Sequence, residues 1–187
     1  MRRLGIIAED DSDVDVVKVL ASKVLPRQTL VVRSFVGRGC GKLRSKSRYW
    51  ASSLREQKCS ILVLVHDLDT ARLATLRAQL AEALDPSPIA NSVIVIPVHE
   101  IEAWLLSDSV AIRRAFHLKK PVPKTANPES IPRPKERLEH VVYATSRKTK
   151  RYVNTLHNGR IAAELDLNLV RRCPSFLLLE NFLRQHV

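Results

Sequence analysis

The sequence predicts an α/β protein in which helices flank a parallel sheet and a small, mainly α-helical extension follows. Short β-branched runs alternate with longer stretches that carry apolar residues at helical spacing. Strands separated by helices are joined by right-handed crossovers, which make neighbouring strands parallel. The third run, residues 60–65, is almost continuously aliphatic, which is typical of a strand buried on both faces.

Four runs of this kind are the expected strands, and each is bounded by residues that turn the backbone. Acids follow the first and third runs, and a glycine-rich turn at residues 37–41 follows the second. An Asp-Pro-Ser-Pro segment precedes the fourth. The strands are expected at residues 4–8, 29–36, 60–65 and 93–98.

Helices are expected where apolar residues recur three and four positions apart. The clearest is residues 71–84, in which four leucines share one face. Asp11 is suited to cap the first helix, which Pro26 ends. Another short helix carries Trp104. The remaining helices are expected at residues 14–25, 42–57, 135–144, 159–170 and 175–186.

A proline-rich segment divides the chain. Residues 121–134 contain five of the ten prolines, so we expect an extended connector there. The α/β domain is therefore predicted at residues 1–117 and the basic helical extension at residues 118–187.

Composition excludes several classes of protein. The longest apolar runs are far too short to cross a bilayer, so no membrane partner is expected. The first residues lack a small-residue cleavage site, so we expect no signal peptide. The three cysteines are odd in number and widely spaced, which favours reduced thiols and a cytoplasmic location over disulfides or a zinc site.

The chain is strongly basic, with 31 Lys and Arg against 19 Asp and Glu and a formal net charge of +12. Such a field attracts polyanions, and DNA is the expected partner. Bases prevail from Arg113 onward, and this stretch is either a groove for a phosphate backbone or a solvated basic surface. The candidate nucleic-acid contacts are Arg38, Lys42, Lys148, Lys150 and Arg151.

Carboxylates follow three of the predicted strands. Because the carboxyl ends of parallel strands share one edge of the sheet, these acids are expected to converge. Oxygen ligands without Cys or His pairs suit Mg²⁺ or Mn²⁺, whereas Asp10, Asp11 and Asp13 are equally suited to cap a helix. Side chains two residues apart on a helix point in different directions, which favours Glu100 over Glu102 as a metal ligand. The candidate metal ligands are Glu9, Asp67, Asp69, Glu100 and Glu102.

Two of these segments resemble the TOPRIM domain of topoisomerases, primases and OLD-type nucleases. They are Ile-Ile-Ala-Glu at residues 6–9, followed by Asp13, and Leu-Val-His-Asp-Leu-Asp at residues 64–69. In that family a lone Glu after the first strand and an Asp-x-Asp after the third bind Mg²⁺ together. Residues 99–108 are similar to a Glu-x-Glu-Ala-Trp signature of small standalone TOPRIM-like proteins, which are often encoded beside ATPases in phage-defence clusters. Residues 134–136 and 173–176 also resemble that group.

The resemblance implies metal-dependent cleavage or nicking of DNA by a phosphodiesterase (endonuclease), in a phage-defence or DNA-processing setting with a possible ATPase partner. It assigns catalysis to Glu9, Asp67 and Asp69. The chain departs from the pattern at Asn154, where relatives are expected to have the lysine of Tyr-x-Lys. Lys135 or Lys150 would then take the place of that lysine, and Lys135 is the candidate.

Two other interpretations stay open. The first is a non-catalytic module that holds Mg²⁺ while binding nucleic acid or docking a partner. The second is a receiver-like domain in which Asp67 is the phosphoacceptor. It is less favoured, because no later strand ends in the Lys-Pro pair of receivers.

Overall fold

A computed structural model, which describes residues 2–38 and 40–187, confirms the α/β class and the parallel sheet. The strand order is β2-β1-β3-β4, so β1 and β3 are central and both are extensively buried. In register, Leu4 of β1 lies between Val32 of β2 and Ile61 of β3. The strands are β1 (Arg2–Ala8), β2 (Leu30–Val36), β3 (Ile61–Val65) and β4 (Asn91–Val95).

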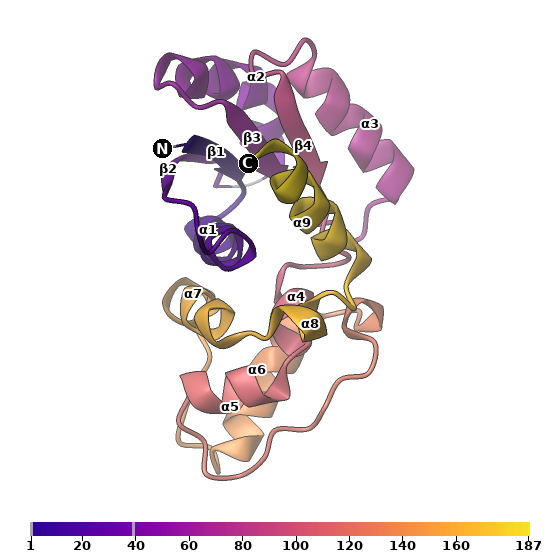
Figure 1. Cartoon of the computed structure of the whole chain (residues 1–187). Coiled ribbons are helices and arrows are strands. Elements are labelled where there is room, and N and C mark those ends of the chain that lie inside the picture. The colour runs from indigo at the N-terminus through magenta and orange to yellow at the C-terminus, as the bar shows by residue number, and fades with distance from the viewer. Residues whose placement is uncertain (1, 39) are drawn as a thin grey trace.

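Helices cover both faces of this sheet (Figure 1). Ile6 and Val63 face α1 (Asp11–Val24) and α9 (Pro174–His186) within one apolar cluster. Ile7 and Leu64 point the other way, into a second cluster with α2 (Cys40–Glu56) and α3 (Leu73–Leu84). The alternation follows from the two-residue period of a strand and explains why the central strands are apolar throughout.

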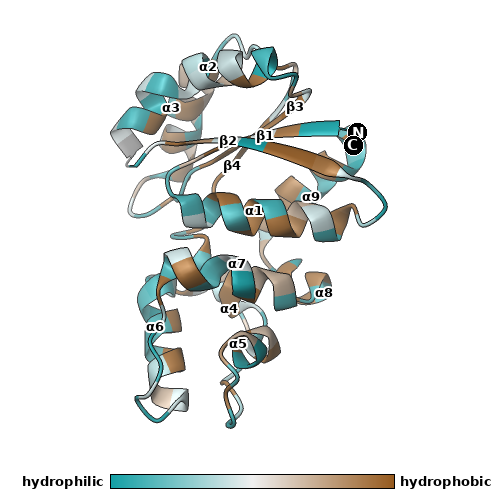
Figure 2. Ribbon diagram, turned by 90° about the vertical axis from the view of Figure 1, so that its left-hand side faces the viewer, coloured by the Kyte–Doolittle hydropathy of each residue, from teal (hydrophilic) through white to brown (hydrophobic). Residues whose placement is uncertain are grey.

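A helical lobe lies beyond α1, on the side away from the sheet (Figure 2). Its helix α7 packs on α1 and so connects the lobe to the sheet layers. The packing is close at Gly159 of α7, where a Cβ would lie 3.3 Å from Asp15 Cβ. The elements of the lobe are α4 (Glu102–Leu106), α5 (Ser109–Ala115), a 3₁₀ turn η1 (Pro128–Ser130), α6 (Pro134–Thr145), α7 (Asn154–Glu164) and α8 (Leu167–Val170).

The single helix expected at residues 159–170 is wrong, because the structure has two helices there. The first, α7, begins earlier, at Asn154. The second, α8, has its own cap, in which the Asp166 side chain accepts a hydrogen bond from the backbone N–H of Asn168. A capping aspartate inside an apolar pattern is a helix start that the periodicity alone does not reveal.

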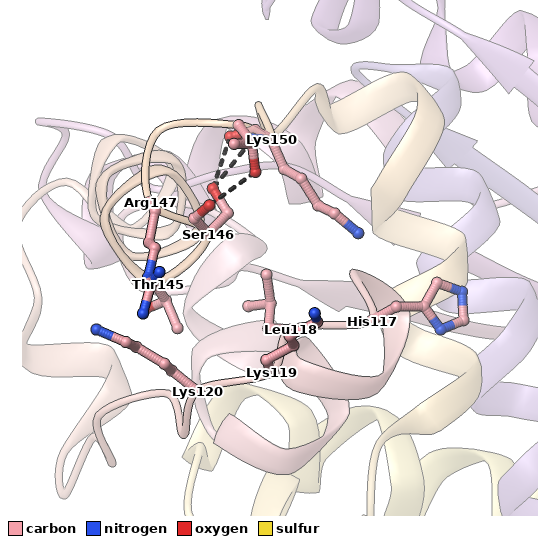
Figure 3. Close-up of a pocket in the computed structure, with 9 residues that line it drawn as sticks. His117, Leu118, Lys119, Lys120, Thr145, Ser146, Arg147 and Lys150 are labelled. Carbon is pink, nitrogen blue, oxygen red and sulfur yellow. Dashed lines mark hydrogen bonds between the residues drawn. The ribbon is translucent and has the colours of Figure 1, made fainter.

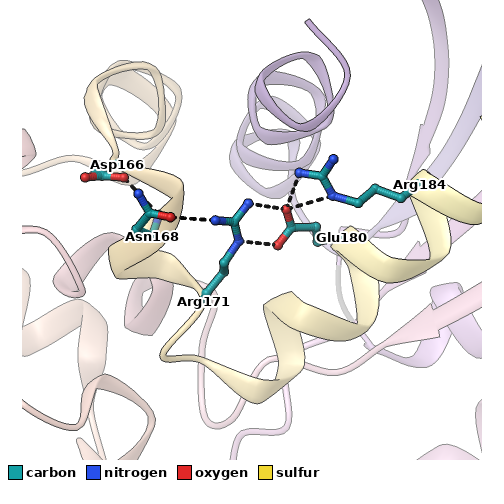
Figure 4. A network of polar contacts seen from close by, with 5 residues as sticks. All are labelled: Asp166, Asn168, Arg171, Glu180 and Arg184. Atoms are coloured by element: carbon teal, nitrogen blue, oxygen red, sulfur yellow. Dashed lines mark hydrogen bonds and ion pairs between the residues drawn. The ribbon is translucent and has the colours of Figure 1, made fainter.

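The last helix returns to the sheet, where α9 lies beside β4 and α1. Its Glu180 is buried and accepts a bidentate pair of hydrogen bonds from Arg171, with Nη2 to Oε1 at 2.7 Å (Figure 4). Arg184 donates to the same carboxylate, and these bonds, led by those from Arg171, hold the pKa of Glu180 below its usual value. The domain boundary after residue 117 stays a prediction. The chain beyond that residue supplies α9, which packs beside the sheet.

The Glu-Ala-Trp segment and the Cys-Pro-Ser-Phe segment meet in the core. Trp104 is fully buried, its Nε1–H donates to Ser175 Oγ at 2.7 Å, and its ring meets Phe176 edge-on. The tryptophan therefore fixes α4 against the start of α9. Among the helices of the described residues, none combines the length and apolar character needed to cross a bilayer.

Candidate acidic site at the carboxyl edge of the sheet

The carboxyl ends of β1, β3 and β4 open onto one cavity of about 260 Å³ between the sheet and the helical lobe. The structure brings four of the five predicted acids to its wall, and Asp10 and Asp13 from the start of α1 join them. Arg38 and Lys135 supply positive charge. The cavity is lined by Glu9, Asp10, Asp13, Arg38, Asp67, Glu100, Glu102, Lys135 and Asn154.

Asp67, directly after β3, is tied to the turn after β4. Its Oδ1 accepts a hydrogen bond from the backbone N–H of Ile101 at 2.9 Å. Burial raises its pKa well above the usual value, and the neighbouring charges of Asp13 and Glu102 raise it further. Asp67 therefore holds a proton more readily than an exposed aspartate unless a cation compensates.

Asp13 was equally suited to cap a helix or to join the acids at the strand ends, and the structure gives it both roles. It completes a capping box, in which its Oδ2 accepts from the backbone N–H of Asp10 at 3.1 Å. Its side chain is also buried in the cavity wall, where burial, followed by the charge of Glu102, raises its pKa to about 7. In the sequence, Asp13 was marked by its place after the first predicted strand and by its part in the segment that resembles TOPRIM domains.

Glu9 is paired with a buried histidine. His66 Nδ1 lies 2.7 Å from the backbone carbonyl of Asp67, and because a carbonyl only accepts, Nδ1 is the donor. His66 Nε2 lies 3.1 Å from Glu9 Oε1 but lacks hydrogen-bond alignment with it. Burial raises the pKa of Glu9, and the nearby His66 and Arg44 oppose that rise. Neither His66 nor Arg44 was among the predicted site residues.

Glu100 and Glu102 both line the cavity, although they are two residues apart. The reason is that β4 ends at Val95 and not at residue 98, so Glu100 lies in a turn before α4 begins. Glu100 Oε2 accepts from the backbone N–H of Lys135 at 2.8 Å, in the first turn of α6. Burial raises the pKa of Glu100, and this hydrogen bond opposes the rise.

Glu102 is held by two side chains that sequence reasoning did not assign to the site. Its Oε1 accepts from Tyr152 Oη at 2.8 Å and from Asn158 Nδ2 at 3.1 Å, and all three residues are buried. Burial and then the charge of Glu102 raise the pKa of Tyr152, so the phenol stays protonated and donates. The sequence signal was the Tyr-x-Asn segment for Tyr152, whereas nothing marked Asn158.

Asp69 lies outside the cavity lining. The prediction that it shares a face with Asp67 required an extended segment, but its φ is 47° and its backbone N–H turns to the His99 carbonyl. It is exposed, yet close enough for its charge to raise the pKa values of Glu9 and Asp67.

The predicted basic residues divide into two groups. The backbone N–H of Arg38 donates to the Glu9 carbonyl at 2.9 Å, which places Arg38 at the cavity, whereas Lys42 is exposed on α2 and does not line it. Gly39, within the predicted glycine turn, lies outside the described residues. The second group lies at the far end of the helical lobe and comprises Lys148, Lys150 and Arg151.

Position 154 faces the cavity, where the resemblance led us to expect a lysine. Asn154 occupies it and donates from Nδ2 to Ser12 Oγ at 3.3 Å. Lys150 points elsewhere, because its Nζ donates to the Phe116 carbonyl. Among the described residues, Lys135 is therefore the lysine that lines the cavity.

The donor set fits a hard divalent cation in chemistry. Within residues 2–38 and 40–187, no group of three His, Cys, Asp or Glu side chains is already arranged to bind a metal ion. The carboxylate side chains would therefore have to rotate toward a bound ion. The hydrogen bonds described above use one oxygen of each of four acids and leave the second for a ligand. These oxygens are the ligands that Mg²⁺ and Mn²⁺ prefer. The bonded oxygens are Asp13 Oδ2, Asp67 Oδ1, Glu100 Oε2 and Glu102 Oε1.

Comparison with known proteins yields one match. Residues 8–184 match the family model DUF4276, described as a domain of unknown function. No curated protein and no solved structure matches the chain.

Proposed function

The chain belongs to the DUF4276 family, and from the geometry of its acidic cavity we propose that it is a metal-dependent phosphodiesterase that cuts or nicks DNA. One observation carries this proposal: acids from three strand ends line one cavity together with Arg38 and Lys135. Clustered buried carboxylates with raised pKa values are the arrangement that a divalent cation stabilises. A basic chain brings a polyanion to such a site.

Glu9, Asp67 and Glu100 would hold the metal, with Asp13 and Glu102 as further donors. A divalent cation supplies activation of water and stabilisation of the leaving oxygen in phosphoryl transfer. The chain's own residues do the rest. Lys135 and Arg38 bind the negative phosphate oxygens, and Tyr152 and Asn158 hold Glu102 in place. His66, whose Nε2 lies 3.1 Å from Glu9 Oε1, is the candidate positioning residue for Glu9.

DNA as the substrate is supported by the resemblance to TOPRIM nucleases and by the net charge of +12. An ATPase partner and a role in phage defence are proposed on the resemblance alone. The two signature segments that carry it meet at Trp104 and Ser175, behind the cavity wall formed by Glu102.

The test is incubation of supercoiled plasmid with the purified chain and Mg²⁺ or Mn²⁺, with and without chelator. We expect nicked or linear DNA only when the metal is present. Asp67→Asn should abolish the product, because it removes a charged donor while its amide oxygen still accepts from Ile101. Glu82→Gln, an exposed change on α3, is the matched control and should cut as the wild type does.

Cleavage by Asp67→Asn at the wild-type rate would overturn the proposal. Absence of cleavage by the wild type under every metal condition, combined with metal-dependent DNA binding, would instead establish the non-catalytic module.

A further inference from the structure

A second hollow, of about 500 Å³, lies at the far end of the helical lobe from the acidic cavity. Figure 3 shows the residues that line it. Two loops build it, one following α5 and one following α6. Its cations are Lys119 and Lys120 from the first loop and Arg147 and Lys150 from the second. No Asp or Glu of the described chain lines this hollow, so nothing in its wall neutralises the four charges.

The positive charge continues past the rim of this hollow. A neighbouring depression of about 580 Å³ shares His117, Leu118 and Lys119 with it and adds Arg113 and Arg114. Its one acid, Glu164, is 3.9 Å from Arg114. The cations therefore form a band along the lobe and not a closed ring around one point, which suits a chain of phosphates better than a single anion.

The lining chemistry suits a phosphate backbone better than an unpaired base. No Phe, Tyr or Trp of the described residues lines the hollow, and its aromatic group is the imidazole of His117. Its other polar side chains are cations and hydroxyls, which contact phosphate and sugar.

We propose that this hollow, which we call the basic hollow, binds the phosphate backbone of a nucleic-acid duplex whose cleaved bond lies in the acidic cavity. The location of the cleaved bond rests on the proposed function, whereas the binding of the backbone does not. The trio predicted from the sequence is thereby revised, because Lys150 lines the hollow with Lys119, Lys120 and Arg147, while Arg151 lies beside Glu136 and Glu139 in a different depression.

Helix α6 sets the spacing of the two sites. Lys135 in its first turn lines the acidic cavity, and Thr145 at its end lines the basic hollow. Lys135 and Thr145 are ten residues apart in this helix and so lie about 15 Å apart along the helix axis. A duplex that runs along α6 rises 3.4 Å per base pair, so the phosphates held by the hollow lie about four base pairs from the cleaved bond. Figure 2 shows α6 running along the lobe between these two ends.

The experiment measures the binding of a labelled duplex of about 20 base pairs by fluorescence anisotropy, over a range of salt and with chelator present. The variant is Lys119→Ala combined with Lys120→Ala, two exposed side chains that line the hollow. The control is Arg27→Ala combined with Arg55→Ala, which removes the same charge from exposed positions at the opposite edge of the sheet. We expect the salt slope of the variant to become shallower by about 1.8, and that of the control to change less.

An equal change of slope in both double variants would overturn the proposal, because it would show a diffuse field and not a site. Competition by inorganic phosphate or ATP as effective as that by unlabelled duplex would overturn it too, in favour of a small-anion site. The titrations contain chelator, so their result does not depend on cleavage. The experiments therefore distinguish two cases. In one, the chain cuts DNA but the hollow does not bind the duplex; in the other, the hollow binds the duplex but the chain does not cut it.

Discussion

At the scale of single residues, Asp67 is held in an environment that opposes its charge. Burial and the charges of Asp13 and Glu102 raise its pKa well above the usual value. In the metal-free protein at a pH above that raised pKa, ionised Asp67 therefore destabilises the fold. An asparagine keeps the acceptor for the Ile101 N–H and removes the charge.

We therefore predict that Asp67→Asn, in chelator at pH about 8, melts at or above the temperature of the wild type. Added Mn²⁺ should raise the melting temperature of the wild type and of Glu82→Gln but not that of Asp67→Asn, because a ligand stabilises only the state that binds it. Differential scanning calorimetry measures all three. A large drop for Asp67→Asn in chelator would show that the carboxylate supports the fold.

A second prediction concerns the pH dependence that Asp13 imposes. Its pKa is raised from 3.8 to about 7. Below 3.8 both folded and unfolded states are protonated, and above about 7 both are ionised. Between these limits the folded state keeps a proton that the unfolded state has lost, so rising pH destabilises the fold, by up to about 1.4 kcal/mol per pH unit.

Asp13→Asn removes this dependence and keeps an oxygen for the Asp10 N–H. Its free energy of unfolding in urea, relative to the wild type, should rise as the pH increases between 3.8 and about 7 and then level off. A difference that does not change with pH would contradict the burial of this carboxyl.

The sequence allowed the strand-end acids to be identified but not their partners. Glu9, Asp67 and Glu100 follow apolar runs, and parallel topology requires such positions to share an edge. Tyr152, which precedes α7, and Asn158, within α7, reach Glu102 from 50 and 56 residues away along the chain. Contacts of this kind depend on the orientation of a whole helix, which no local pattern encodes.

At the scale of elements, the turn between β4 and α4 decides how many acids face the cavity. The apolar run continues through Ile96 and Pro97, which predicts a longer strand, but proline lacks the N–H that a ladder requires. The strand ends at Val95, and Ile96 and Pro97 remain buried in the turn. Burial, and not strand pairing, accounts for their apolar character.

The same turn connects the sheet to the lobe, since Glu100 accepts from the N-terminal turn of α6. Glu100→Ala removes this acceptor and should lower stability by about 1 kcal/mol, as loss of a helix-capping side chain does. Glu100→Gln keeps an oxygen acceptor and should melt near the wild type. Both should weaken Mn²⁺ binding. Equal melting temperatures for the two variants would show that the hydrogen bond to Lys135 contributes nothing to stability.

At the scale of the whole molecule, the cavity exists because the sheet and the helical lobe pack against each other. The sheet supplies Glu9 and Asp67, and the lobe supplies Lys135 and Asn154. Alternating strands and helices made the parallel sheet predictable. The packing of α7 on α1 and the return of α9 to the sheet were not, because they depend on matching surfaces far apart in sequence.

The most direct test of the claim that this cavity holds a divalent cation is calorimetric titration of the metal-free chain with Mn²⁺. The wild type and Glu82→Gln should show saturable binding, and Asp67→Asn should show none, because it lacks a charged donor. The account would be contradicted if the wild type bound no Mn²⁺, or if Asp67→Asn bound it with the affinity of the wild type.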